Sequence, residues 1–113
     1  GGIGLDGAPS TISMIPEIVD SVGRDIEVVQ CGGIRQGSDI LKALALGARA
    51  VMTARPFLAG LAAAGEAGVA HVIDLLRYDM ETTMRLCGIP SAGAIDSSIL
   101  ISDSEQSTHP NAS

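Results

Sequence analysis

The chain has 113 residues, an apolar fraction of 46%, one Phe, one Tyr and no Trp. Its formal net charge of −6 comes from acidic residues spread along the chain, which disfavours nucleic acid or an anionic membrane as a partner. We see no signal peptide and no membrane-spanning run of about 20 apolar residues, and Cys31 and Cys87 lie far apart in the sequence, so we expect reduced thiols and a cytoplasmic protein.

The N-terminal part of the chain predicts a helix followed by a strand. Ser10 is a residue type that caps helices, and it predicts a first helix through about Ser21 that contains Pro16 and ends at Gly23. The apolar run Ile26–Val29 then predicts a strand.

The next helix and strand follow directly. Ser38 or Asp39 can cap a second helix through Leu46, and Gly47 ends it. Residues Ala50–Thr53 predict the next strand. Connections this short, with a right-handed crossover, make the two strands parallel neighbours.

The remaining elements are mostly helical. Residues Phe57–Ala64 predict a short helix that Gly65 breaks, and a longer helix from about Ala67 to Leu86 has apolar residues at three- and four-residue spacings. Gly88 ends that helix, and a possible strand at Gly1–Leu5 precedes all of these elements. Residues 1–101 are therefore predicted to form one α/β domain.

The polar end of the chain and the two histidines carry no predicted chemistry. Residues 102–113 are rich in serine and other polar types and predict a disordered tail. His71 lies on the polar side of the last helix and His109 lies in the tail, and neither shares a face with a second ligand. We therefore expect no metal site.

Two short segments, one after each of the two predicted strands, together predict a phosphate site. Gly32 and Gly33 follow the first strand and permit left-handed backbone conformations that bring N–H groups against an anion. Arg35 and Arg55 can each form a bidentate, charge-assisted pair with phosphate oxygens. The helix that opens at residues 37–39 adds a favourable dipole. A Gly-Gly pair is also common in tight turns, and a lone arginine is common on protein surfaces. The order of strand, glycines, arginine, helix, strand and arginine nevertheless favours a site for a phosphate-bearing cofactor.

A family resemblance covers residues 1 to about 100. The chain resembles the C-terminal part of the FMN-dependent 2-hydroxy-acid oxidases and dehydrogenases, which include glycolate oxidase, lactate oxidase and flavin lactate dehydrogenases. The stretches that carry the resemblance are Leu5–Pro9, Gly32–Arg35, Leu41–Ala50, Arg55–Pro56, Leu61–Ala63, Gly65–Val69 and Glu81–Met84.

The resemblance implies both a fold and a cofactor. The family's fold is a TIM (β/α)₈ barrel, of which this chain would supply about the last two to three β/α units. Residues 32–35 would lie in the FMN phosphate loop after the seventh strand, and residues 54–55 in the matching loop after the eighth. The complete enzyme would oxidise small 2-hydroxy acids to 2-oxo acids.

Several positions depart from the family's pattern. The family has a histidine that takes the substrate's proton, at a place before Gly1, and Ile3 and Gly4 stand where it has an arginine and a glutamine. Cys31 replaces an aspartate that binds the ribityl chain of the flavin, and Ala54 replaces a glycine. No catalytic residue is therefore expected in this chain. The implied cofactor-binding residues are Cys31, Gly32, Gly33, Ile34, Arg35, Ala54 and Arg55.

The sequence predicts a fragment of an FMN-dependent oxidoreductase that is inactive alone. An open portion of a barrel exposes the inner face and both edges of its sheet, so we expect a homo-oligomer, pairing with a complementary N-terminal barrel portion, or a loosely packed state. One alternative is a different phosphate-binding barrel similar to inosine-monophosphate dehydrogenase, which also has Gly-Gly-Ile-Arg before a helix. Another is a non-enzymatic relic or interaction module. Arg55-Pro56 and Glu81–Met84 favour the first reading.

Overall fold

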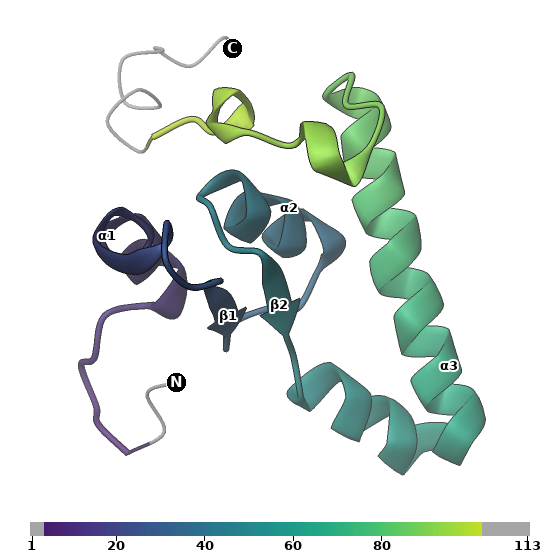
Figure 1. The fold of residues 1–113 in the computed structure, drawn as a ribbon. Helices are drawn as coiled ribbons and strands as arrows, with labels where there is room; N and C mark the ends of the chain where they lie inside the picture. Colours follow the sequence, from purple (N-terminus) through teal and green to yellow (C-terminus); the bar gives the residue numbers. More distant parts are fainter. Residues whose placement is uncertain (1–3, 103–113) are drawn as a thin grey trace, which may run out of the picture.

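Two short parallel strands with helices around them form the centre of the molecule (Figure 1). The computed structural model describes residues 4–102. The strands pair with Val29 opposite Ala50 and Cys31 opposite Met52, which confirms that they are parallel neighbours. The elements in chain order are α1 (Thr11–Val22), β1 (Val29–Cys31), α2 (Gly37–Ala45), β2 (Ala50–Met52), α3 (Arg55–Leu86) and the 3₁₀ turns η1 (Ala92–Ala94) and η2 (Ser97–Ile99).

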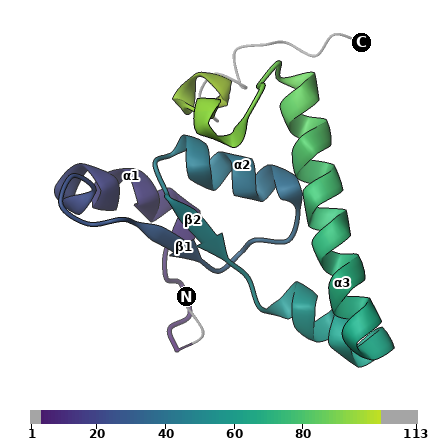
Figure 2. The ribbon, with the colours of Figure 1, turned by 45° about the vertical axis from the view of Figure 1, so that its right-hand side comes forward.

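The hydrophobic core lies between the strands and the helices α1 and α2, and the start of α2 packs against α3, which runs across it (Figure 2). Ala43 and Leu41 of α2 are almost completely buried. The buried core residues are Ile15, Ile34, Ala43 and Ala48, with Ile12, Val19, Ile40, Leu46 and Val51 packed against them.

The opposite face of the two strands is uncovered. Val29 and Met52 are 47% and 60% exposed, although both are large apolar residues. Cys31 and Ala50 are exposed as well, because side chains alternate between the two faces of a strand. The structure is thus a partial α/β fold with one apolar sheet face open, which we call the open sheet face (Val29, Cys31, Ala50 and Met52).

The first helix agrees with its prediction, and the first strand begins later than predicted. Ser10 caps α1 through its side chain, which accepts a hydrogen bond from the Ser13 backbone N–H, and Gly23 ends the helix. The predicted strand Ile26–Val29 is wrong in its bounds. The N–H of Ile26 still donates to the carbonyl of Val22 at the helix end, so extended pairing starts only at Val29.

The start of α2 and the end of β2 are also corrected. Gln36, rather than Ser38 or Asp39, is the residue that precedes α2, and Asp39 lies in the first turn. The predicted strand Ala50–Thr53 ends at Met52, because its partner β1 ends at Cys31 and turns away at the glycine pair; the Thr53 hydroxyl then donates to the carbonyl oxygen of Ile34 at 2.9 Å.

The two helices predicted after β2 form one bent element. α3 begins at Arg55 instead of Phe57, and Ala64 and Gly65 have non-helical backbone angles, with Gly65 at a φ of 58°. The break predicted at Gly65 is therefore confirmed. Below, the short limb means residues 55–63 and the long limb residues 66–86. The limbs pack at Gly60 and Gly68, which are both buried.

Among the helices of the described residues 4–102, α3 is long and apolar enough to cross a membrane by length and composition, with a mean hydropathy of 1.4 over 18 residues. This differs from the expectation that no such segment is present. The bend at Ala64 and Gly65 nevertheless folds α3 back on itself, and α3 packs against α2. Such helices also occur in soluble proteins, so this is weak evidence for a membrane location.

Some predictions concern the chain ends. Gly4 and Leu5 do not lie in a strand, and the rest of the predicted strand Gly1–Leu5 lies outside the described residues. The predicted tail also lies outside them, apart from residue 102, as does His109.

We expect Gly68→Ala to destabilise the fold. A Cβ atom at this position would overlap the carbonyl oxygen of Gly60, which is backbone and cannot swing away. The expected loss is about 1–3 kcal/mol of unfolding free energy. Urea denaturation followed by far-UV circular dichroism measures it.

Gly93→Ala is the matched control, since nothing lies within 4 Å of a Cβ there. Equal midpoints for the two variants would contradict the contact between the limbs.

Candidate functional site

One hollow of about 610 Å³ gathers all seven residues that the sequence singled out for cofactor binding. It lies where the loops after β1 and β2 meet the segment before α1. Its role in binding is a prediction, but the structure does bring the residues together. The seven are Cys31, Gly32, Gly33, Ile34, Arg35, Ala54 and Arg55.

The glycine pair forms a turn that residues with side chains rarely adopt. Gly32 has a φ of 107° and Gly33 a φ of 76°. No atom lies within 4 Å of the place where a Cβ of Gly33 would stand, so the surface above Gly33 is open. Glycine at this position therefore meets a backbone requirement and leaves the peptide accessible to a ligand.

Side chains outside the predicted set hold this loop in place. The Thr11 hydroxyl donates to the carbonyl oxygen of Gly32 at 3.0 Å, and the Gln30 amide donates to the same oxygen at 2.5 Å. Thr53 holds the carbonyl oxygen of Ile34. Sequence reasoning missed Thr11 and Gln30. A buried glutamine in an otherwise apolar strand is the signal that could have indicated Gln30.

Carboxylates of the chain itself accept from several backbone N–H groups at the start of α2. The Asp39 carboxylate accepts from the backbone N–H groups of Arg35 and Gln36, both at 3.0 Å. The Asp79 carboxylate of α3 accepts from the N–H of Ser38 at 3.1 Å. These backbone donors thus bind carboxylates of the chain itself, and an anion site at residues 37–39 stays a prediction.

The start of α3 also faces the hollow. Ala54 precedes the helix and gives it no side-chain cap, and Pro56 occupies its first turn. The short limb therefore directs the positive end of its dipole at the hollow from the loop after β2.

Both predicted arginines are exposed at the hollow. Neither Arg35 nor Arg55 forms an ion pair within the described residues 4–102, where the salt bridges join Arg49 to Glu27 and Arg85 to Glu81. Two guanidinium groups without carboxylate partners therefore line the same hollow, where they can bind an anion.

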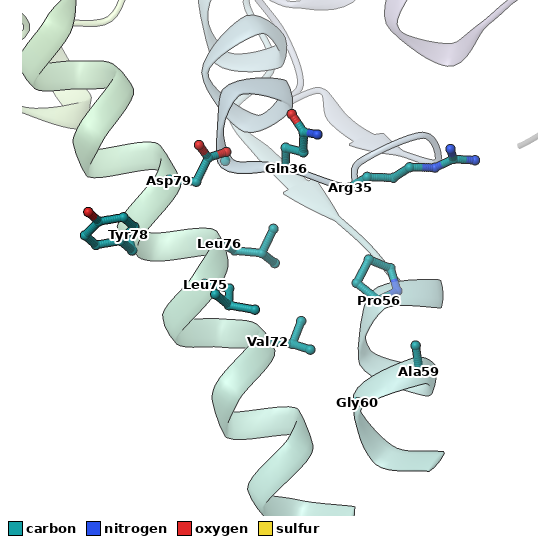
Figure 3. A pocket seen from close by; sticks show the side chains of 11 residues that line it. Arg35, Gln36, Pro56, Ala59, Gly60, Val72, Leu75, Leu76, Tyr78 and Asp79 are labelled. Atoms are coloured by element: carbon teal, nitrogen blue, oxygen red, sulfur yellow. The ribbon is translucent and has the colours of Figure 1, made fainter. Parts of the chain in front are cut away.

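A second hollow of about 510 Å³ lies between the start of α2 and the two limbs of α3. Figure 3 shows Val72, Leu75 and Leu76 of the long limb on one side of it, and Pro56 and Ala59 of the short limb on the other. The Arg35 side chain in the same view points away from the long limb, so its guanidinium is not packed against that limb.

The two departures from the family's pattern have different structural consequences. Ala54 has a φ of −124°, which any residue with a side chain adopts, so its methyl group imposes no backbone strain. Cys31 is an exposed thiol on the open sheet face, opposite Met52. A thiol is a weaker hydrogen-bond acceptor than a carboxylate, so this side of the hollow offers a weaker acceptor than the aspartate of the family's pattern.

The described part of the chain contains no cluster of three His, Cys, Asp or Glu side chains that could hold a metal ion. His71 is exposed on the long limb of α3. The charged side chains that line the hollow are Arg35 and Arg55 together with the carboxylates Asp6 and Asp39.

We expect Asp39→Ala to weaken the junction between the glycine loop and α2. The substitution leaves the N–H groups of Arg35 and Gln36 without their carboxylate, at a cost of about 1 kcal/mol of unfolding free energy. Chemical denaturation measures this change.

Asp39→Asn keeps an acceptor oxygen and should lose less stability than the alanine variant. An alanine variant as stable as the parent chain would contradict the role of Asp39.

The comparisons with known proteins agree with this geometry. Residues 1–102 match the family model described as FMN-dependent dehydrogenase. The chain is 49% identical over 102 residues to a peroxisomal (S)-2-hydroxy-acid oxidase of Oryza sativa subsp. japonica, covering 90% of this chain and 28% of that protein. It is 50% identical over 100 residues to an L-lactate oxidase of a Nostoc species, covering 88% and 27%.

Solved structures give the same result. A mandelate oxidase variant with the monooxide FMN adduct matches with a TM-score of 0.77 at 47% identity, over 82% of this chain and 30% of that one. The (S)-mandelate dehydrogenase of Pseudomonas putida, a soluble mutant of a membrane-associated protein, matches with a TM-score of 0.77 at 42% identity, over 81% and 26%. The chain therefore spans less than a third of the length of these relatives.

Proposed function

Because the chain belongs to the FMN-dependent dehydrogenase family, we propose that it forms the phosphate-binding end of an FMN site. The observation that carries the proposal is that Arg35 and Arg55, which follow two paired parallel strands, line one hollow together with the open Gly33 turn. A phosphate monoester fits this set of donors, since it is a dianion that two guanidinium groups can share.

FMN is the cofactor of the family, and the residues present fit its phosphate better than its polyol chain. Arg35, Arg55 and the N-terminus of α3 supply positive charge for the phosphate. Cys31 stands at the ribityl position that the resemblance implies, where it supplies a weak acceptor. Most of the binding energy of this chain should therefore come from the phosphate.

The proposed reaction is the oxidation of a small 2-hydroxy acid to a 2-oxo acid, in an assembly that includes the rest of a TIM barrel. When bound, the flavin would supply the two-electron acceptor for this oxidation. The relatives are oxidases and dehydrogenases named for lactate, mandelate and other 2-hydroxy acids. The chain's own contribution is to hold and orient the phosphate, and we assign it no catalytic residue. A cytoplasmic location also remains a proposal.

We expect the purified chain to bind FMN at micromolar levels, and riboflavin, which lacks the phosphate, much more weakly. Arg35→Ala and Arg55→Ala should each weaken FMN binding by roughly 10- to 100-fold, the range of a charge-assisted hydrogen bond. Flavin fluorescence titration measures these affinities. High salt should reduce them, because the guanidinium groups are exposed.

Arg85→Ala is the matched control, since Arg85 lies near the far end of α3 and pairs with Glu81. Equal binding of FMN and riboflavin would contradict a phosphate site. A folded chain that binds neither would favour the non-enzymatic relic.

We further propose that the open sheet face is a contact surface for a complementary N-terminal barrel portion. Val29 and Met52 are large apolar residues at this face, and only two strands pair in the described part of the chain, so both sheet edges are also open. The relatives are more than three times as long as the matched region, which supports the proposal that further strands of a barrel would cover this face.

We expect Met52→Lys to prevent association through this face. A charge at the centre of the contact would have to be buried without a partner. Light scattering of the chain mixed with the N-terminal portion of the Nostoc L-lactate oxidase measures the assembly.

Leu86→Lys is the control, because Leu86 is 83% exposed at the end of α3, away from the sheet. Assembly of the Met52→Lys variant at the parent level would rule this surface out. Association of the parent chain with itself alone would indicate a homo-oligomer instead.

A further inference from the structure

The peptide group between Gly32 and Gly33 joins two glycines in the turn that lines the hollow. With glycine on both sides, no Cβ opposes rotation of the peptide plane. The carbonyl oxygen and the N–H of one trans peptide point in opposite directions. Rotation by half a turn would therefore replace the Gly33 N–H, which attracts a phosphate, with the Gly32 carbonyl oxygen, which repels it.

Two buried or half-buried side chains hold this peptide in one orientation. The Thr11 hydroxyl donates to the Gly32 carbonyl oxygen at 3.0 Å, and the Gln30 side-chain amide donates to it at 2.5 Å. The same amide donates to the Thr11 hydroxyl oxygen at 2.9 Å. A carbonyl oxygen has two lone pairs, and both are used here. Rotation of the peptide would break both hydrogen bonds at once.

The orientation of the Gln30 amide follows from its partners. Turning the amide over would place its oxygen against the Gly32 carbonyl oxygen, and two acceptors would then face each other. In the observed orientation the amide oxygen is buried without a hydrogen-bond partner among the described residues. Gln30 is only 4% exposed, so little water competes for its donor group. The observed orientation thus leaves the Gln30 amide oxygen unpaired among the described residues and keeps the hydrogen bond from the amide nitrogen to the Gly32 carbonyl oxygen.

We propose that Thr11 and Gln30 are positioning residues that lock the Gly32–Gly33 peptide with its N–H available to a phosphate between Arg35 and Arg55. The inference rests on the proposed function and adds to it a hydrogen-bonded link between the glycine turn and helix α1. The carbonyl side of the peptide faces Thr11, and Gly33 is exposed with open space above it.

The test combines ligand titration with NMR of the ¹⁵N-labelled chain. The variants are Thr11→Val, which removes only the hydroxyl, Thr11→Ser, which keeps it, and Gln30→Met, which removes the amide. Thr83→Val is the matched control, because the Thr83 hydroxyl also donates to a backbone carbonyl, that of Asp79, but within α3. The ligands are FMN, riboflavin and inorganic phosphate.

We expect Thr11→Val and Gln30→Met each to weaken FMN binding by roughly three- to tenfold, the range for loss of a neutral hydrogen bond. Riboflavin binding should not change, and Thr11→Ser and Thr83→Val should bind FMN like the parent chain. Without ligand, the Gly33 amide signal should be sharp in the parent chain and broadened in Thr11→Val, because the peptide then exchanges between orientations. The amide signal of Ala43 in the core reports whether each variant is folded.

Unchanged FMN affinity in both Thr11→Val and Gln30→Met would overturn the inference and leave the proposed function intact. A parent chain that binds neither FMN nor phosphate would contradict the proposed function. In that case the Gly33 amide signal still tests whether Thr11 holds the Gly32–Gly33 peptide in one orientation. A sharp signal in Thr11→Val would overturn this role. If the valine variant does not fold, the comparison of Thr11→Ser with Gln30→Met gives the same decision.

Discussion

The parallel pairing of β1 with β2 is the constraint on which the candidate site depends. The register that sets Cys31 opposite Met52 brings the loops after both strands to the same edge of the sheet. The Thr53 hydroxyl then joins the second loop to the first at the Ile34 carbonyl. Since α2 forms the crossover between the strands and packs on β2, the core that stabilises α2 also fixes the distance between the two arginine-bearing loops.

Much of this arrangement follows from local signals in the sequence. Glycines end the helices where expected, and the break at Gly65 follows from its positive φ. The bounds of β1 and α2 were less predictable, because they depend on tertiary and capping hydrogen bonds such as those of Asp39. The hydrogen bond between Asp79 and Ser38 spans 41 residues, and nothing in the local sequence of either residue indicates it. The gathering of the seven site residues was predictable because parallel strands share one carboxyl edge.

The open sheet face and the loops of the hollow differ in how far this chain alone covers or holds them. Two strands with helices packed mainly on one side bury one face of the sheet and leave Val29 and Met52 exposed on the other. The loops after β1 and β2, in contrast, are held by hydrogen bonds to side chains of the same chain, among them Thr11, Gln30, Asp39 and Thr53. The loops can therefore be held by local contacts, even though the sheet that carries them leaves an apolar face to be covered.

The distribution of acidic side chains decides which donors remain for an anion. A helix N-terminus is the usual anion site, but Asp39 and Asp79 already accept from the N–H groups around the start of α2. No side chain caps the start of α3, and Arg35 and Arg55 form no ion pair within residues 4–102. The donors at the hollow without a carboxylate partner among the described residues are therefore the two arginines and the start of α3, beside the open Gly33 turn. Because Asp39 and Asp79 already accept from N–H groups around α2, the proposed site depends more on the orientation of the Gly32–Gly33 peptide.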